Sequence, residues 1–370
     1  MHILLVQPNY YTNYPPLGLL KLASYHKSLG DTVEYVKGEK SDVKKPDLIY
    51  VTSLFSYAWR PVHDAVHYYK SLFPDVKVVL GGIYASLLPE HAKSSGADEV
   101  HVGLFKPAED MLPDYSLVPK WDASIMFASR GCIRKCSFCA VPLLEGSVNS
   151  VKYSIKHMIY PSHKRIILWD NNILGCPNWQ AIFDELLKIN RKVDFNQGLD
   201  ARLITNKVAE KLVKLKYDVI RLAHDHCNMS GQVEKAIQRL KEVGVKSRNI
   251  TVYTLFNYND NPEDFFDRVR DILNWGAVSY PMRYEPLCSL QKNAYVAPKW
   301  SLEEIEMVQK SRRVIGYGGA FPPYEGLVKK FEKAKCFREA FALWKPKSDI
   351  ALRFPLKENT GRPLEMVVRG

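Results

Sequence analysis

Residues 124–139 read SIMFASRGCIRKCSFC, a short apolar stretch followed by three cysteines. Cys132, Cys136 and Cys139 have the spacing C-x3-C-x2-C. A loop of this kind can present one thiolate to each of three irons in a cubane cluster and leave the fourth iron without a protein ligand. With seven cysteines in 370 residues, chance produces this spacing only about 0.0025 times per chain. The stretch therefore predicts a 4Fe-4S cluster with one open iron, bound directly after a strand.

A structural zinc site is the main alternative for these cysteines. Such a site needs four closed ligands, which commonly come in two pairs. The remaining cysteines stand alone in the sequence: Cys176, Cys227, Cys288 and Cys336. We interpret these four as small buried side chains, and they offer no ligand set for a second cluster.

The composition is ordinary for a globular protein, with 46% hydrophobic and 25% charged residues. A chain of 370 residues has enough length for two domains and a tail. No apolar run approaches the length of a membrane span, and residues 1–6 look like a strand and not like a charged leader. Unpaired cysteines are typical of a reducing compartment. We therefore expect a cytoplasmic protein with no membrane partner.

The formal net charge of +12 is unevenly distributed along the chain. Residues 1–110 contain 11 Lys and Arg against 12 Asp and Glu, whereas residues 299–370 contain 15 against 9. This asymmetry is compatible with a polyanionic substrate. A solvated basic surface explains the same charge, and the sequence has no nucleic-acid motif and no basic stripe interleaved with aromatic residues. Both interpretations stay open.

The first hundred residues alternate between strand-like and helix-like patterns. Strands are predicted at 3–6, 32–36, 48–52, 76–80 and 99–102, with helices at 17–29, 62–73 and 86–94. Five strands that alternate with helices predict a flavodoxin-like, doubly wound parallel sheet, which binds its ligands at the carboxyl ends of the strands. We assign this first domain to residues 1–106.

Residues 107–123 contain three prolines and are predicted to be a linker. Six further strands follow, at 124–128, 165–169, 192–195, 219–223, 250–256 and 278–282. The predicted helices between them lie at 179–189, 207–215, 233–243 and 262–273. This pattern predicts a partial (β/α)6 TIM-type barrel over residues 124–298, with function at the carboxyl ends of its strands.

The last segment, 299–370, is predicted to be a basic and mainly helical C-terminal extension. Helices are expected at 302–314 and 327–343. Between them, the glycine-rich stretch 316–323 lacks the spacing of a phosphate-binding loop, so we interpret it as a hinge or lid.

The cysteine loop, with Phe138 just before its third cysteine, resembles the signature of the radical S-adenosylmethionine (radical SAM) superfamily. The resemblance implies that Cys132, Cys136 and Cys139 bind a 4Fe-4S cluster and that the open iron chelates SAM. It also implies a low-potential electron donor of the flavodoxin or ferredoxin type. Reductive cleavage of SAM would then produce a 5′-deoxyadenosyl radical.

Polar residues after the barrel strands are the candidates for holding SAM. Asp170 and Asn171 follow the second strand, and Gln197, Asp200 and Arg202 follow the third. In the superfamily the end of the second strand holds the amino group of the methionine moiety. The third strand end could reach ribose hydroxyls and the carboxylate. A helix cap at Asn171 and a surface ion pair of Asp200 with Arg202 are the structural alternatives.

Two later strand ends are also polar. His224 and His226 follow the fourth strand, where either a metal or ordinary loop hydrogen bonds would explain them. Asn259 and Asp260 follow the fifth strand in a turn that resembles the adenine side of the SAM site. Both are equally explained as residues that begin a helix.

The first domain also resembles the cobalamin-binding domain found in one branch of the superfamily. The stretches 15–18 and 81–86 carry this resemblance. The lower-ligand pattern D-x-H-x-x-G is absent, because Asp64 and His67 have the first spacing but Lys70 stands in place of the glycine. Whether cobalamin is bound stays open.

The sequence therefore predicts a radical SAM enzyme that modifies an unidentified substrate by methylation, rearrangement or bond formation. It includes the option of a cobalamin-dependent methyltransferase. Two alternatives remain: a non-catalytic iron-sulfur protein that transfers electrons or senses redox state, and a nucleic-acid-binding or RNA-modifying protein that uses the basic barrel and tail.

Overall fold

The computed structural model describes residues 1–344, and the part of the predicted extension at 345–370 lies outside the described residues. By its contacts the chain forms two compact units. The first unit is Met1–Ile166 with Glu285–Tyr295, and the second is Ile167–Tyr284 with the residues from Val296 onward. This division does not test the predicted boundaries at 106, 123 and 298, which stay predictions.

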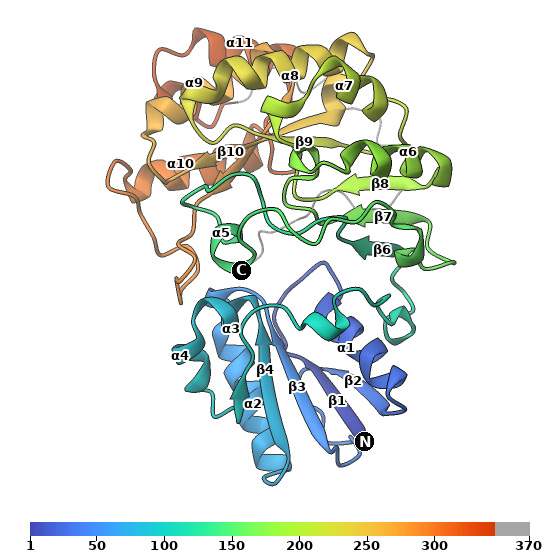
Figure 1. Ribbon diagram of the computed structural model, residues 1–370. Coiled ribbons are helices and arrows are strands. Elements are labelled where there is room, and N and C mark those ends of the chain that lie inside the picture. The colour runs from blue at the N-terminus through green and yellow to red at the C-terminus, as the bar shows by residue number, and fades with distance from the viewer. Residues whose placement is uncertain (345–370) are drawn as a thin grey trace. The chain divides into compact units, whose positions relative to one another are not determined.

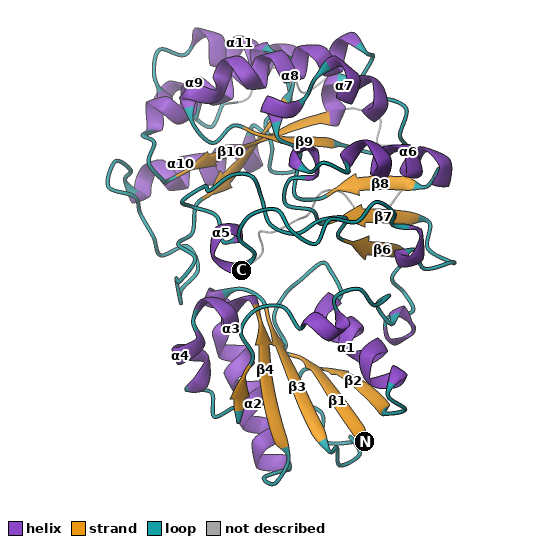
Figure 2. Ribbon diagram, viewed as in Figure 1, coloured by secondary structure: helices purple, strands orange, loops and turns teal. Residues whose placement is uncertain are grey.

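The first unit contains a five-stranded parallel sheet (Figure 1; Figure 2). Its hydrogen-bonded order is β2-β1-β3-β4-β5, and all four neighbouring pairs are parallel. The strands are β1 (His2–Gln7), β2 (Thr32–Lys37), β3 (Leu48–Ser53), β4 (Lys77–Gly82) and β5 (Glu99–Val100). The five predicted strands are therefore present, each within a few residues of its predicted position.

Helices cover both faces of this sheet. Leu4 and Val6 of β1 belong to a buried cluster with the apolar residues of α2 (Trp59–Leu72). Ile3 and Leu5 belong to a different cluster, which includes residues of α1 (Leu17–Ser28). Because successive side chains of a strand point to opposite faces, α1 and α2 lie on opposite sides of the sheet.

The single helix predicted at 86–94 is wrong, because the structure has two short helices there. They are α3 (Ile83–Leu87) and α4 (Pro89–Lys93). Leu88 between them has φ −132° and ψ 59°, outside the helical region. The ring of Pro89 disfavours a helical conformation of the residue before it, so the chain must interrupt the helix at that point.

All six strands predicted for the second half of the chain are present. They form two three-stranded sheets, with orders β6-β7-β8 and β11-β10-β9. The strands are β6 (Ala123–Met126), β7 (Arg165–Leu168), β8 (Lys192–Phe195), β9 (Ile220–Ala223), β10 (Ile250–Phe256) and β11 (Val278–Arg283). The pairs β9–β10 and β10–β11 are parallel. The chain is thus an α/β protein built on parallel sheets.

Four helices fill the gaps between these strands, as predicted. They are α6 (Trp179–Ile189), α7 (Asn206–Leu212), α8 (Ser230–Glu242) and α9 (Pro262–Asn274). Helix α9 begins with a capping box in which the Asn261 side chain accepts from the Asp264 backbone and Asp264 accepts from the Asn261 backbone. This reciprocal pair satisfies N–H groups that lack partners in the first turn. One further short helix, α5 (Val141–Leu144), follows the third cysteine of the loop.

The C-terminal extension begins with α10 (Leu302–Val314), which matches the prediction. The second predicted helix, at 327–343, is wrong as a single element: it is α11 (Glu325–Lys333) followed by α12 (Phe337–Ala340). The buried Lys330 donates from Nζ to the carbonyl oxygens of Ala340 (2.7 Å) and Ala342 (2.8 Å). These bonds satisfy carbonyls at the end of α12 that have no helical partner.

Within the second unit, the extension pairs with β11. Phe321 exchanges two backbone hydrogen bonds with Ser279 of β11 (3.0 and 2.8 Å). The glycine-rich stretch before Phe321 closes as a tight turn, in which Tyr317 and Ala320 form an antiparallel bridge. The interpretation of this stretch as a hinge or lid stays a prediction.

No helix among residues 1–344 is both long enough and apolar enough to cross a membrane.

Candidate metal centre and cofactor site

The three-cysteine loop belongs to the first unit and is closed at its base by backbone hydrogen bonds. Arg130 N donates to Asn149 O and Asn149 N donates to Arg130 O, both at 2.9 Å. Lys152 N donates to Ala128 O at 2.8 Å. The loop therefore leaves the buried end of β6 and returns beside it, so its two ends are fixed while the cysteines lie in the middle.

Gly131, directly before Cys132, is required by the shape of this loop. Its φ is +72°, and a Cβ atom at this position would overlap the carbonyl group of Ser147 and lie 2.9 Å from Gly146 O. Cys132 N also donates to Gly146 O at 3.2 Å. Only glycine combines a positive φ with such a close backbone approach. The residue before the first cysteine therefore brings the two sides of the loop together.

Beneath the loop lies a buried network of charged side chains, centred on Arg130, which is 6% exposed. Its guanidinium group donates to Glu109 (Nε 2.7 Å, Nη2 2.6 Å) and to Glu145 (Nη1 3.1 Å), and lies 3.3 Å from the centre of the Phe127 ring. Glu145 also accepts from Gly131 N at 2.8 Å.

Lys21 of α1 extends this network. Its ammonium lies 3.2 Å from the Glu109 carboxylate and donates to the Glu109 carbonyl oxygen. Burial lowers the pKa of Lys21, against the opposing effect of Glu109, with Arg130 acting in the same direction as burial. Two cations therefore share two carboxylates below the cysteine loop, and together they fix it to the first unit.

The cysteine side chains are partly exposed, and two of their sulfurs accept backbone hydrogen bonds. Arg134 N donates to Cys132 Sγ at 3.3 Å, and Val141 N donates to Cys139 Sγ at 3.5 Å. A third bond, from Cys139 N to Cys136 O at 3.1 Å, forms the turn that contains Phe138. Backbone N–H groups directed at sulfur are among the contacts that tune protein-bound iron-sulfur clusters. The loop therefore has the donor set and local hydrogen bonding that suit such a cluster.

No group of three or more His, Cys, Asp or Glu side chains in the described part of the chain is arranged to hold one metal ion. A cubane differs from a single-ion site, because each cysteine binds a different iron.

In the second unit, two of the three residues predicted at the third strand end, Asp200 and Arg202, belong to one network. Asp200 accepts from Arg202 Nε at 2.9 Å and from Nη2 at 2.6 Å, and its Oδ2 also accepts from Asn172 Nδ2 at 3.0 Å. Burial alone would raise the pKa of Asp200. The hydrogen bonds from Arg202 and Asn172 and the positive charge of Arg202 have the larger, opposite effect, so the pKa of Asp200 is below its usual value. The ion pair that was the alternative for Asp200 and Arg202 is present, but it is not a surface pair at Asp200, whose side chain is 3% exposed.

The other predicted strand-end residues differ in their burial. Asp170 is buried just beyond β7, Asn171 is half-buried, and Gln197 is exposed with its Nε2 donating to Asn196 Oδ1 at 3.4 Å. The helix cap predicted at Asn171 is instead made by its neighbour, because Asn172 Oδ1 accepts from Gly175 N at 3.2 Å. Phe138 belongs to the first unit and the strand-end residues to the second. Their common role in binding SAM stays a prediction.

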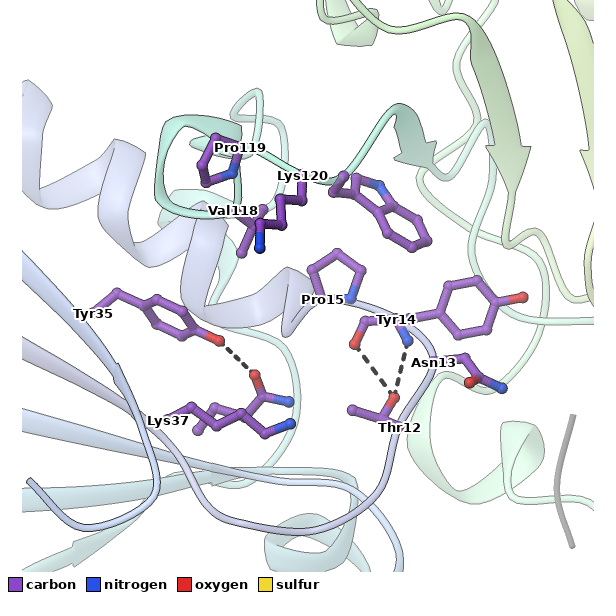
Figure 3. A pocket seen from close by; sticks show the side chains of 11 residues that line it. Thr12, Asn13, Tyr14, Pro15, Tyr35, Lys37, Val118, Pro119 and Lys120 are labelled. Carbon is purple, nitrogen blue, oxygen red and sulfur yellow. Dashed lines mark hydrogen bonds between the residues drawn. The ribbon is translucent and has the colours of Figure 1, made fainter. Parts of the chain in front are cut away.

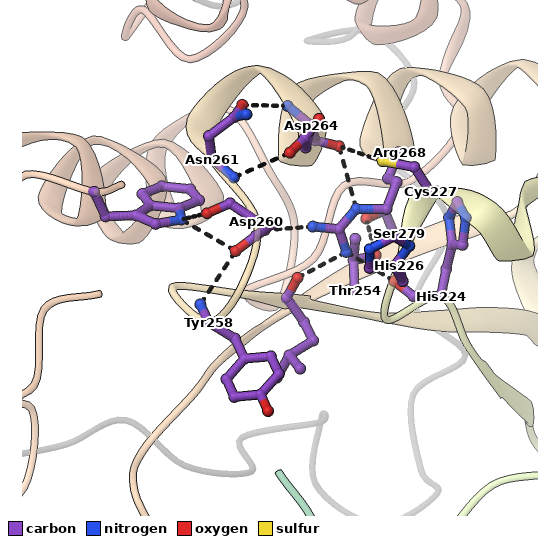
Figure 4. Close-up of polar contacts among 12 residues, drawn as sticks. His224, His226, Cys227, Thr254, Tyr258, Asp260, Asn261, Asp264, Arg268 and Ser279 are labelled. Atoms are coloured by element: carbon purple, nitrogen blue, oxygen red, sulfur yellow. Dashed lines mark hydrogen bonds and ion pairs between the residues drawn. The ribbon is translucent and has the colours of Figure 1, made fainter. Parts of the chain in front are cut away.

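The two histidines after β9 are hydrogen-bonded loop residues. Figure 4 shows both histidines near Arg268. His224 is fully buried, with Nε2 3.1 Å from Ser230 Oγ, and His226 Nδ1 accepts from Asn228 N at 3.2 Å. Burial, reinforced by Arg268 and His226, lowers the pKa of His224 to about 3. His224 is therefore neutral at physiological pH and acts as part of the packed interior.

Asp260, in the turn predicted to resemble the adenine side, is held by a buried arginine (Figure 4). Arg268 is 1% exposed and pairs with Asp260, while two of its other N–H groups donate to the carbonyls of His224 (2.9 Å) and Leu255 (2.8 Å). Trp300 Nε1 donates to the Asp260 carboxylate at 3.1 Å. The helix-cap alternative is wrong for Asp260, because Asn261 makes the cap of α9.

The interpretation of the four isolated cysteines as buried residues holds for only one of them. Cys176 is buried, Cys336 is partly exposed, and Cys227 and Cys288 are exposed. The interpretation fails at Cys227 and Cys288 because both lie in connections, where the pattern of apolar residues that marks a core position is absent.

The residues spaced like a corrinoid-ligand motif are parts of a helix. Asp64 and His67 lie within α2, where the ring of His67 is 6.4 Å from that of His63. Lys70, in the place of the motif glycine, pairs with Asp98 at 3.0 Å. These residues do not complete the D-x-H-x-x-G pattern of a histidine-ligated corrinoid, because Lys70 replaces the glycine and His67 is an exposed residue of a regular helix.

Sequence reasoning missed Lys21, Glu109, Arg130 and Glu145, which hold the cysteine loop. Charged residues are usually exposed, and nothing in the local pattern marks these four as buried partners. The one available signal was Gly131 between Arg130 and Cys132, since a glycine in a functional loop often marks a close backbone approach.

Comparisons with known proteins give a likeness of fold. No protein-family model and no curated protein sequence matches the chain. Among solved structures, the chain is similar to the radical SAM methyltransferase TsrM from Kitasatospora setae, which was solved with a tryptophan substrate and a SAM analogue. The alignment has a TM-score of 0.59 and 14% sequence identity, and it covers 84% of this chain and 76% of that chain. Coproporphyrinogen III oxidase (HemN) from Escherichia coli, a radical SAM enzyme, aligns at 0.37 and 14% identity, over 56% and 57%, too low to support an argument. The chain therefore shares its fold with a radical SAM enzyme of known structure.

Proposed function

We propose that this protein is a radical SAM enzyme that binds a 4Fe-4S cluster through Cys132, Cys136 and Cys139. The observation that carries the proposal is the cysteine loop, whose three sulfur donors lie between two ends fixed by hydrogen bonds. The fold shared with TsrM supports it. The finer fold description, a flavodoxin-like sheet followed by a partial (β/α)6 barrel, is part of the same proposal; the order β2-β1-β3-β4-β5 supports the first half.

A cluster held by Cys132, Cys136 and Cys139 would offer an open iron to SAM and would supply the electron for reductive cleavage of its sulfonium to methionine and a 5′-deoxyadenosyl radical. The chain's own residues position this chemistry. The N–H groups of Arg134 and Val141 point at two ligand sulfurs, and the buried pairs of Arg130 hold the loop in one conformation. A fixed loop orients the reactants without further reorganisation.

The proposal extends to the strand-end residues of the second unit as SAM contacts: Asp170, Asn171, Gln197 and Arg202. Asp200 would act differently. Its two oxygens already accept three side-chain hydrogen bonds from Arg202 and Asn172, so it orients the guanidinium of Arg202, which is suited to a carboxylate ligand. Asp200 is therefore a positioning residue in this proposal.

The cluster is tested by anaerobic reconstitution of the full chain with iron and sulfide. We expect about four irons per chain and an electron paramagnetic resonance signal after reduction that changes when SAM is added. A change of the signal on SAM addition requires an open iron, so it separates this proposal from an iron-sulfur protein that only transfers electrons.

The matched control uses one cysteine of the loop and one outside it. Cys136→Ala should lose the cluster signal, whereas Cys288→Ala, which changes an exposed and isolated cysteine, should retain it. Equal iron content and equal signals in the two variants would contradict the assignment of the ligands.

A second candidate, more specific than the first, is methyl transfer, because the fold is shared with an enzyme described as a methyltransferase. The products distinguish the two. After incubation with SAM, a strong reductant and methylcobalamin, 5′-deoxyadenosine alone indicates hydrogen abstraction. S-adenosylhomocysteine as an additional product indicates methyl transfer. Retention of cobalamin through gel filtration would test corrinoid binding directly, without any turnover.

A further inference from the structure

An open pocket of about 430 Å³ lies at the carboxyl ends of β1 and β2, within the first unit (Figure 3). Its walls are the last residues of the two strands, the loop 12–15 and the connection 118–121. Parallel sheets with connecting helices bind ligands at the carboxyl ends of their strands. The volume is within the range of sites for small molecules.

Gln7, at the end of β1, supplies a fixed hydrogen-bond donor to the pocket. Its side chain is buried at 4% exposure, and its Oε1 accepts from Tyr35 OH at 2.5 Å. The Nε2 group of Gln7 donates no hydrogen bond to any of the described residues. Buried polar groups are normally hydrogen-bonded, and this amide is held by Tyr35 so that its donor remains for a ligand acceptor.

The charges around the pocket are positive. Lys37 and Lys120 line it, below and above the pocket in the view of Figure 3. Neither lysine makes an ion pair within residues 1–344, and no Asp or Glu lines the pocket. Two unpaired ammonium groups and an amide donor favour a ligand with anionic oxygens.

The remaining walls combine two polar residues, Thr12 and Asn13, with aromatic and proline side chains. Trp121 is held by a hydrogen bond from Nε1 to Ala123 O, and its ring lies 5.8 Å from the ring of Tyr14 at an interplanar angle of 64°. Pro15 and Pro119 complete these walls. Rigid aromatic and proline surfaces favour planar ring systems.

We infer that this pocket binds a small planar anion, namely an aromatic or heteroaromatic ring that carries a phosphate or a carboxylate. None of the cysteine ligands or proposed SAM contacts lines the pocket. The inference is therefore independent of the proposed function, and a failure of one leaves the other in place.

The test is isothermal titration calorimetry on the full chain with its cluster reconstituted. The probes are uridine monophosphate and orotate, with uridine as the neutral arm. Both anions contain a uracil ring, with a phosphate on the attached ribose in the first and a carboxylate on the ring itself in the second. We expect at least one anion to bind at sub-millimolar concentration and uridine to bind more weakly. Which anion binds identifies the acidic group that the site prefers.

Three variants test the assigned contacts. Lys37→Met and Lys120→Met should each weaken binding of the anion about fivefold, as expected for the loss of one exposed charge contact. Gln7→Glu keeps an acceptor for Tyr35 but replaces the donor with a carboxylate, and should weaken binding at least tenfold. Lys106→Met, at an exposed lysine of the same unit outside the pocket, is the control and should bind as the unchanged protein does.

Two results would overturn the inference. One is the absence of binding by both anions at millimolar concentration. The other is binding that is equally strong in the unchanged protein and in Lys37→Met and Lys120→Met. Lys37 and Lys120 are exposed, so Lys37→Met and Lys120→Met should fold normally. These two variants therefore test anion binding in the pocket even if Gln7→Glu is unstable.

Discussion

At the scale of single residues, the cysteine loop depends on Gly131, because backbone atoms of Ser147 and Gly146 occupy the space that a side chain at this position would need. Gly131 and Gly146 both have φ +72°, but a Cβ at Gly131 would overlap Ser147, whereas nothing lies within 4 Å of a Cβ at Gly146. The two positions therefore share the same backbone strain and differ only in the space around the Cβ atom. They form a matched pair for substitution.

We predict that Gly131→Ala prevents loading of the cluster and that Gly146→Ala does not. Both variants should lose about 1 kcal/mol through the positive φ. Only Gly131→Ala must also separate the two sides of the loop. The measurements are iron content after reconstitution and thermal unfolding of the chain. Equal iron content in the two variants would show that the close approach at Gly131 is unimportant.

A second residue-scale prediction concerns the charge network below the loop. Arg130→Met removes one cationic partner from each of Glu109 and Glu145 in a largely buried network, which should lower the free energy of unfolding by about 3–5 kcal/mol. The control is Asp110→Asn, which removes an ion pair between Lys152 and a 76% exposed carboxylate and should cost less than about 1 kcal/mol. Urea denaturation measures both, and similar losses would refute the role of the buried network.

The pH dependence of stability follows from His224. Its pKa of about 3 in the folded protein is below the value of about 6.5 in an unfolded chain. The unfolded state therefore binds more protons between these values, so stability is complete above pH 6.5 and falls as the pH is lowered. At pH 5 the loss is about 2 kcal/mol relative to neutral pH. His224→Gln should reduce this difference, as measured by urea midpoints at pH 7 and pH 5; an unchanged difference would contradict the assignment.

At the scale of elements, local patterns located the strands well and the ends of helices less well. The pattern of apolar residues placed all eleven strands within a few residues of their positions, because most of the strands direct apolar side chains into the interior. The helices predicted at 86–94 and 327–343 are each divided. Pro89 could have indicated the first division. The second depends on Lys330, whose side chain bonds carbonyls near α12, a contact that no local pattern reveals.

The packing of the C-terminal extension gives an element-scale prediction. Phe341 is fully buried, and its ring lies 5.5 Å from Phe265 of α9 and 4.6 Å from Phe337 of α12. Phe341→Ala should lower the free energy of unfolding by about 3–5 kcal/mol, because it removes a large side chain from a packed interior. Leu343→Ala, two residues away and 51% exposed, should change it by less than about 0.5 kcal/mol. Thermal unfolding would disprove the packing role if both variants behaved alike.

At the scale of the whole molecule, the α/β class and the cysteine loop could be predicted from the sequence. The charged side chains that hold the loop could not. The spacing of the cysteines is a local feature and could be recognised directly. The partners that hold the loop, Glu109 and Glu145 with Lys21, come from separate elements, so their meeting depends on the tertiary fold. The pocket at β1 and β2 is likewise formed by segments about a hundred residues apart, beyond the reach of sequence patterns.

The central claim is that the three cysteines of the loop hold a cluster that cleaves SAM. The most direct measurement is the anaerobic formation of 5′-deoxyadenosine from SAM and a strong reductant, detected by mass spectrometry. We predict product from the reconstituted protein and from Cys288→Ala, and none above background from Cys132→Ala, Cys136→Ala or Cys139→Ala. Product formed equally by the three loop variants, or by none of the proteins despite a full complement of iron, would contradict the account.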